Sequence, residues 1–175
     1  MLEAMNRSYG HTFAELLIVL CLLTIMANIA TPVLSRILEA QQRTTALNQM
    51  LGALVYSRSS AVFGRRSTVL CAGTGDCNGS TIWAQQLTIF HDLNANGRRD
   101  VGETLLRQEL LPKEYSWHWA SFRKLPHAIF EADGSTRAAN GTLTLCKGEQ
   151  PQKQIVINLV GRIRYQQPAP GATCH

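Results

Sequence analysis

The residues best suited to chemistry stand near the end of the chain, in the segment Gly161-Arg162-Ile163-Arg164-Tyr165. On a β-strand, Arg162 and Arg164 would point to one side and Ile163 to the other, because side chains alternate between faces. Two neighbouring guanidinium groups match consecutive phosphates of a nucleic-acid backbone. Gly161 would let the backbone turn and approach a ligand closely. The segment therefore predicts a phosphate-binding site, and the alternative is a pair of arginines that protects a sheet edge from aggregation.

Three further residues would extend this site. Lys147 and Lys153 are near in sequence and would add positive charge, and Tyr165 could stack on a base. The whole chain has 175 residues, with 17 Lys and Arg against 12 Asp and Glu, which gives a net charge of +5. An excess of this size permits a polyanionic partner but does not require one.

A second candidate site is the segment 92–103, which we call the acidic loop. Its oxygen-bearing side chains follow the calcium-loop spacing DxNxNGxxDxxE, with a glycine at the sharp turn. However, EF-hand loops lie between helices, both flanks here have the pattern of strands, and Arg98 and Arg99 add positive charge. We therefore favour a plain hairpin over a calcium site. The residues in question are Asp92, Asn94, Asn96, Gly97, Asp100 and Glu103.

Four cysteines lie in the polar part of the chain and lack zinc-site spacing. They predict two disulfides and an oxidising compartment. Three pairings are possible, of which we favour nearest neighbours, Cys71 with Cys77 and Cys146 with Cys174. Nothing in the sequence suggests a base beside an activated thiol, and the five histidines show no metal-ligand spacing. We expect no catalytic residue and no cofactor, so the protein is not expected to be an enzyme.

The tryptophans at positions 83, 117 and 119 are expected to pack in the core. Trp117 and Trp119 are two residues apart and share one face of a strand. The alternative for this pair is an exposed stacking platform.

The N-terminal part of the chain contains an uncharged, apolar segment at residues 16–34. Its 19 residues nearly span a hydrocarbon core of roughly 30 Å at about 1.5 Å per residue. No small-residue cleavage site follows it, so we expect a membrane helix and not a removed secretory signal. Glu15 stands at its edge, where burial in lipid would be costly unless the charge is neutralised or paired. A carboxylate at the headgroup level without a role is the alternative.

The block Gly10-His11-Thr12-Phe13-Ala14-Glu15-Leu16-Leu17 resembles the type III signal of type IV pilins and type II secretion pseudopilins. The resemblance implies that a prepilin peptidase removes residues 1–10 as a leader by cleaving after Gly10, and that His11 is then N-methylated. It also implies that Glu15 acts in assembly by pairing with the N-terminus of a neighbouring subunit. The sequence departs from the usual pattern at His11, where the family has Phe, and at Phe13-Ala14, where it has two aliphatic residues.

Helical periodicity continues beyond the apolar segment. Apolar residues recur at three and four positions up to residue 62, which predicts one helix over 13–63 that ends near Gly64 and bends at Pro32. Residues 11–34 would form the membrane and filament-core part, and residues 35–63 an amphipathic part that packs on a head at 64–175.

The rest of the chain has the pattern of short antiparallel strands, which with the helix predicts an α+β fold. The expected strands are Ser67–Cys71, Thr81–His91, Thr104–Leu110, Ser116–Ala120, Ala128–Glu131, Thr142–Cys146 and Gln154–Tyr165.

Several segments in order resemble the GspH/FimT family of minor pilins. They are Tyr56-Ser57-Arg58-Ser59-Ser60-Ala61-Val62, Phe90-His91-Asp92, Gly141-Thr142-Leu143-Thr144-Leu145-Cys146 and Ile155-Val156-Ile157-Asn158. The resemblance implies a pilin fold, insertion in the inner membrane with the head in the periplasm, and assembly with other major and minor pilins into an extracellular pilus.

Gly161-Arg162-Ile163-Arg164 is also similar to the GRxR motif of the FimT branch of this family. That likeness implies sequence-independent binding of extracellular DNA for uptake in natural transformation. Two alternatives stay open: a structural minor pilin or pseudopilin that primes assembly of a pilus or of a type II secretion pseudopilus, and an adhesin-like head.

Overall fold

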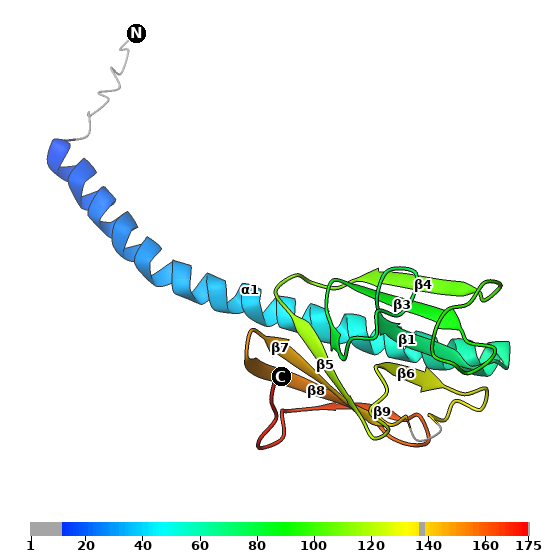
Figure 1. Cartoon of the computed structure of the whole chain (residues 1–175). Helices are drawn as coiled ribbons and strands as arrows, with labels where there is room; N and C mark the ends of the chain where they lie inside the picture. The colour runs from blue at the N-terminus through cyan, green and yellow to red at the C-terminus, as the bar shows by residue number, and fades with distance from the viewer. Residues whose placement is uncertain (1–11, 137–138, 175) are drawn as a thin grey trace, which may run out of the picture. The chain divides into compact units, whose positions relative to one another are not determined.

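The computed structural model describes residues 12–136 and 139–174. Within them the chain forms one long helix, α1 (Phe13–Gly64), followed by strands (Figure 1). The chain divides into two compact units, Met1–Gln41 and Gln42–His175. The strands are β1 (Thr68–Ala72), β2 (Ile82–Trp83), β3 (Gln86–His91), β4 (Leu105–Leu110), β5 (Ser116–Ser121), β6 (His127–Phe130), β7 (Gly141–Lys147), β8 (Gln150–Ile157) and β9 (Ile163–Gln166).

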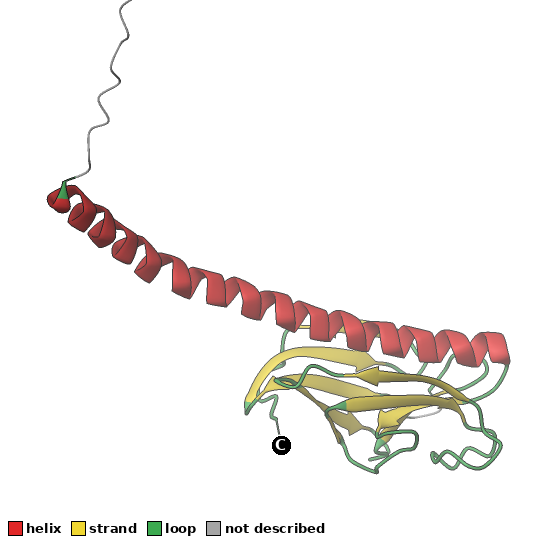
Figure 2. Cartoon of the chain, turned by 90° about the horizontal axis from the view of Figure 1, so that it is seen from above, coloured by secondary structure: helices red, strands yellow, loops and turns green. Residues whose placement is uncertain are grey.

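The strands form two antiparallel sheets. The first has the order β4-β3-β1-β6, and the second has the order β2-β5-β7-β8-β9. In the second unit the helix from residue 42 onward lies along one side of the sheets (Figure 2). Strand β9 is an edge strand, because it pairs only with β8. The fold is α+β, as the sequence predicts.

The main core lies between the helix and the inner faces of both sheets. The helix contributes small and large residues at three- and four-residue spacing, which places them on one face. Its fully buried members are Ala46, Met50, Ala53, Leu54, Ser57 and Ala61. Ser57 is tolerated there because its hydroxyl donates to Ala53 O at 2.8 Å. A smaller cluster, which includes Val69, Phe90 and Ile129, covers the other face of the first sheet.

The helix ends as expected at Gly64, but a different residue takes the left-handed conformation. Arg65 has φ 49°, its N–H donates to Val62 O, and the N–H of Arg66 donates to Ala61 O. This pair of bonds is the Schellman arrangement, which satisfies the last helical carbonyls. A methyl group at Gly64 would lie 3.0 Å from the His91 ring, so the ring would have to shift by a few tenths of an ångström to make room for it.

Two of the expected strands are each divided in the structure. The segment Thr81–His91 contains β2 and β3, which belong to different sheets, and the break falls at Gln85, whose φ is 65°. The segment Gln154–Tyr165 contains half of β8 and most of β9, and these two strands form a hairpin around residues 158–162. In both cases a run of strand-forming residues conceals a break that contains a left-handed residue, Gln85 in the first and Gly161 in the second.

The tryptophans are core residues, and the stacking-platform alternative is wrong. Trp83, Trp117 and Trp119 are at most 4% exposed. Trp117 and Trp119 do share one face of β5, but this face packs into the core. Trp83 and Trp119 also contact each other, with ring centroids 5.6 Å apart. Burial removes the ring faces that a nucleic-acid base would need.

Candidate functional site

The β8–β9 loop, residues 158–162, closes the hairpin that carries the two arginines. Asn158 N–H donates to Arg162 O, and Gly161 N–H donates to Asn158 O. The Asn158 side chain also accepts from the N–H of Arg162 at 2.8 Å. The loop is therefore closed by its own first and last residues, so Arg162 has a fixed backbone position at the entry to β9.

Arg162 and Arg164 are both exposed and lie on either side of a partly buried residue, Ile163, which packs against the core. Arg164 pairs across the hairpin with Val156, and Ile163 pairs with Ile157. Within residues 12–136 and 139–174, neither guanidinium group makes a hydrogen bond or an ion pair. Both cations are thus available to a partner outside the chain.

Gly161 has a different role from the one that we expected. Its φ is 73°, and a methyl group on it would lie 1.8 Å from Gly134 O. Gly161 itself is buried. The close approach that requires glycine is therefore to the backbone of residue 134, because the two turns pack directly on each other, and not to a ligand.

The structure does not bring Lys147 and Lys153 to the arginine pair. Lys147 pairs with Gln150, eight residues before Asn158, which corresponds to roughly 26 Å along β8. Side chains alternate between the two faces of β8, so Lys153 lies on the face opposite to that of Gln154 and Val156. Arg164 pairs with Val156, so Lys153 and Arg164 lie on opposite faces of the sheet. Tyr165 follows Arg164 directly and is 62% exposed, but it pairs with Ile155 and therefore lies on the opposite face of β9 from Arg164.

A disulfide fastens the C-terminal tail beside this hairpin. Cys146 and Cys174 are bonded, with a sequence separation of 28. The buried Gln154 side chain accepts from Ala169 N–H at 3.0 Å and donates to Thr144 Oγ1 at 3.1 Å. The tail therefore packs on the outer face of the second sheet. Arg164 lies on this same face, because it pairs with Val156. The other disulfide joins Cys71 and Cys77, so the nearest-neighbour pairing is confirmed.

The acidic loop is organised around carboxylates that accept hydrogen bonds from its own N–H groups. Asp92 is 1% exposed, and its oxygens accept from Asn96 N–H at 3.2 Å and Gly97 N–H at 2.8 Å. Glu103 accepts from Leu93 N–H at 2.7 Å and Asp100 N–H at 2.9 Å. Strands β3 and β4, which flank this loop, pair with each other antiparallel, so the loop closes a hairpin as the sequence predicts.

Asp100 completes the acidic loop at its surface. One of its oxygens accepts from the side-chain amides of Asn94 and Asn96, each at 2.7 Å. These bonds lower the pKa of Asp100 below its ordinary value. Across the described ranges, no group of three His, Cys, Asp or Glu side chains is arranged to hold a metal ion. The calcium alternative stays a prediction.

The acidic loop also contacts the Cys71–Cys77 loop and the buried side chain of His127. Arg99 donates from its N–H to Asp76 and from its side chain to Gly75 O, which joins the acidic loop to the Cys71–Cys77 loop. His127 covers Gly97 so closely that a methyl group there would lie 2.1 Å from the ring. Burial lowers the pKa of His127, and the charge of Asp92 opposes this shift.

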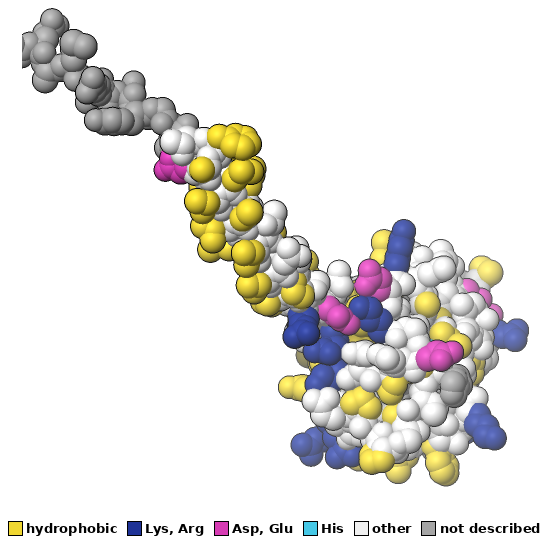
Figure 3. Space-filling view, turned by 90° about the vertical axis from the view of Figure 1, so that its left-hand side faces the viewer, with side chains coloured by type: hydrophobic (Ala, Val, Ile, Leu, Met, Phe, Trp, Pro, Cys, Tyr) yellow, Lys and Arg dark blue, Asp and Glu magenta, His cyan; other side chains and the backbone are white. Residues whose placement is uncertain are grey.

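The N-terminal unit presents a different kind of surface. Its part of α1 is long and apolar enough to cross a membrane, by length and composition. Hydrophobic side chains cover the visible face of this segment, whereas Lys, Arg, Asp and Glu side chains are scattered over the head (Figure 3). This contrast suggests membrane anchoring.

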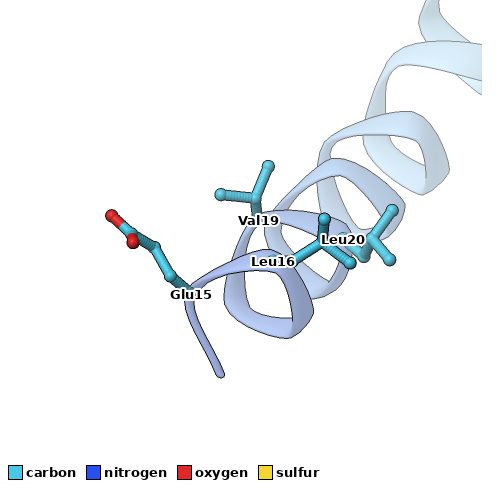
Figure 4. A pocket seen from close by; sticks show the side chains of 4 residues that line it. All are labelled: Glu15, Leu16, Val19 and Leu20. Carbon is cyan, nitrogen blue, oxygen red and sulfur yellow. The ribbon is translucent and has the colours of Figure 1, made fainter. Parts of the chain in front are cut away.

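Glu15 lies in the first turn of the helix. Thr12 directly precedes the helix, and its hydroxyl accepts from the N–H of Glu15 at 3.3 Å. The carboxylate of Glu15 points away from the side chains of Leu16 and Leu20, with which it lines a shallow hollow (Figure 4). Gly10 and His11 lie outside the described residues.

Comparison with known proteins decides the family. The family model for the type II transport protein GspH matches residues 46–161. The chain belongs to the GspH family. The match covers the last part of the helix, strands β1 to β8 and residues 158–161 of the β8–β9 loop, and it ends before Arg162 and β9. Members of this family are structural pilins and pseudopilins, which are not enzymes. No curated protein sequence matches at a significant level.

Solved structures show the same fold. The chain is similar to the type IV minor pilin FimU of Pseudomonas aeruginosa, with 21% identity and a TM-score of 0.57 over 78% of this chain and 95% of that one. It is also similar to the minor pseudopilin EpsH of the Vibrio cholerae type 2 secretion system, with 13% identity and a TM-score of 0.48 over 74% and 98% of the two chains. The likeness to FimU shows that this GspH-family chain has the fold of a minor pilin.

Sequence reasoning missed the residues that hold the β8–β9 loop from outside. Arg58, Gly134 and Thr136 are each more than twenty positions from the segment that they contact. The only local signal was the Asp133-Gly134 turn pair, which predicts a turn but not its partner.

Proposed function

We propose that this chain is a minor pilin whose head binds DNA without sequence preference, for uptake in natural transformation. The observation that supports the proposal is the arginine pair, Arg162 and Arg164: both side chains are exposed, both lack a partner among the described residues, and both stand on a backbone fixed by hydrogen bonds. Guanidinium groups in this state suit phosphates, which carry charge at every nucleotide. Tyr165, which is exposed on the opposite face of the same edge strand, would stack on a base.

The remaining parts of the proposal concern assembly. Prepilin peptidase would cleave after Gly10, His11 would be methylated, and the helix would hold the chain in the inner membrane with its head in the periplasm. Glu15 would then pair with a neighbouring pilin's N-terminus in the pilus. Thr12 supports this role, because its hydroxyl caps the first turn and fixes the backbone that carries the carboxylate.

A mobility-shift assay tests the DNA proposal with the full-length chain in a non-ionic detergent. We expect the wild-type chain to shift a duplex of arbitrary sequence, and we expect Arg162→Gln combined with Arg164→Gln to abolish the shift at moderate salt. The control is Lys147→Gln combined with Lys153→Gln, which removes the same charge at the other end of β8 and at the other face. We expect this control to keep the shift.

Two results would contradict the DNA proposal. If the wild-type chain produces no shift, only a structural role in priming assembly remains. If both double variants lose the shift equally, binding follows net charge and not the arginine pair.

A further inference from the structure

The backbone of the β8–β9 loop is held by side chains from two remote segments. Arg58, on the helix, donates from Nη2 to Val160 O at 3.2 Å and from Nε to Gly134 O at 3.0 Å. Thr136 donates from its hydroxyl to Asn158 O at 3.2 Å and from its N–H to Leu159 O at 2.9 Å. Three successive loop carbonyls therefore have donors that come from outside the loop.

These hydrogen bonds lie where the β8–β9 loop packs on the turn that contains Gly134. Arg58 bridges the two turns, and Gly161 lies so close to Gly134 O that no side chain fits between them. With its carbonyls turned inward, the loop leaves the side chains of Leu159, Val160 and Arg162 exposed. Arg162 consequently stands on a segment whose backbone is fixed before any partner arrives.

We propose that Arg58 and Thr136 are positioning residues for the DNA-binding arginine pair, an inference that rests on the proposed function. They contact no phosphate themselves. They hold residues 158–160 so that Arg162 enters β9 at a fixed point beside Arg164. Because the backbone is already ordered, binding DNA costs less conformational entropy than it would from a mobile loop.

The geometry at position 58 uses two donors of the arginine side chain. Its planar fork directs Nε and Nη2 to two carbonyls at once. A lysine ammonium would preserve the charge but offers a single point donor on a flexible stem. Arg58→Lys therefore separates positioning, which needs the fork, from a direct phosphate contact, which needs mainly the charge.

The experiment measures DNA affinity of the full-length chain in detergent by fluorescence anisotropy, at a temperature where all variants are folded. We expect Arg58→Lys and Thr136→Val each to weaken binding roughly tenfold, the equivalent of one charge-assisted contact. The control is Arg43→Gln, on the same helix, which loses a bond to Gln152 of β8 and should bind like the wild-type chain.

A double-mutant cycle identifies how Arg58 acts. If it positions Arg162, then Arg58→Lys has no further effect in a chain that already carries Arg162→Gln. Additive losses would overturn the inference, because they would mean that Arg58 acts independently of Arg162. Wild-type affinity in Arg58→Lys would overturn it as well.

Amide hydrogen exchange supplies a readout that does not depend on DNA. In Arg58→Lys we expect faster exchange at Thr136, Gly161 and Arg162, with unchanged protection in β7. Unchanged exchange at these three amides would overturn the inference even if DNA binds. A wild-type chain that fails to bind DNA would overturn the proposed function instead, and the exchange rates would then decide whether Arg58 holds the loop.

Discussion

The acidic loop and the β8–β9 loop use charged residues in opposite ways. In the acidic loop the carboxylates stabilise the fold: Asp92 and Glu103 are buried and accept hydrogen bonds from the loop's own N–H groups. In the β8–β9 loop the backbone carbonyls accept from remote donors, while Arg162 and Arg164 stay exposed. The difference teaches that a charged motif points to a partner only when the fold leaves its charges unpaired.

The largest effect is expected at the contact between the two glycines. Gly161→Ala would place a methyl group 1.8 Å from Gly134 O and would force a left-handed alanine, so the loop must move. We expect a loss of about 3 kcal/mol in the free energy of unfolding, measured by chemical denaturation, together with weaker DNA binding.

Gly148→Ala is the matched control, since Gly148 has φ 57° and open space around it. It should cost only about 1 kcal/mol, the cost of the left-handed conformation. Equal losses in the two variants would mean that the packing of the two turns contributes nothing to stability.

In the acidic loop the comparison predicts an effect on stability alone. Asp92→Ala would leave the N–H groups of Asn96 and Gly97 without their acceptor, which should cost about 2 kcal/mol. Asp100→Ala, at the exposed surface of the same loop, should cost much less. DNA affinity should stay unchanged in both variants, and a tenfold loss of affinity in Asp92→Ala would break the division between the two loops.

The smallest effect concerns pH. Burial lowers the pKa of His127, so the unfolded chain takes up a proton near pH 6.5 whereas the folded chain takes it up only at lower pH. The unfolded state then binds more protons, and stability falls as the pH drops below about 6.5. His127→Asn should reduce this fall, and His91, whose pKa burial also lowers, should account for part of the remainder. Thermal denaturation at pH 7.5 and pH 5.5 measures the difference, and an unchanged fall in the variant would contradict it.

Much of the fold could be predicted from the sequence because the determining signals are local. The expected helix over 13–63 differs by one residue at its end from α1. The nearest-neighbour disulfides are also confirmed. Periodicity and short cysteine spacings are properties of contiguous residues, so they can be recognised without knowing the tertiary structure.

The divided strands and the support of the loop could not be predicted, for a physical reason. Gln85 takes a left-handed conformation that its residue type does not favour. The sequence indicates that Gly161 allows a close approach, but that approach is to Gly134, which only tertiary packing brings to it, and not to a ligand. Likewise, no local pattern connects Arg58 to Val160, because the bond between them spans 102 positions.

The salt dependence of DNA binding tests the central claim most directly. The observed binding constant of the wild-type chain for duplex DNA should fall linearly on logarithmic axes as salt rises. Removing Arg162 or Arg164 should each flatten this slope by about 0.9, and removing both by about 1.8. A double variant that keeps the wild-type slope would contradict the claim that these two exposed arginines contact the phosphates.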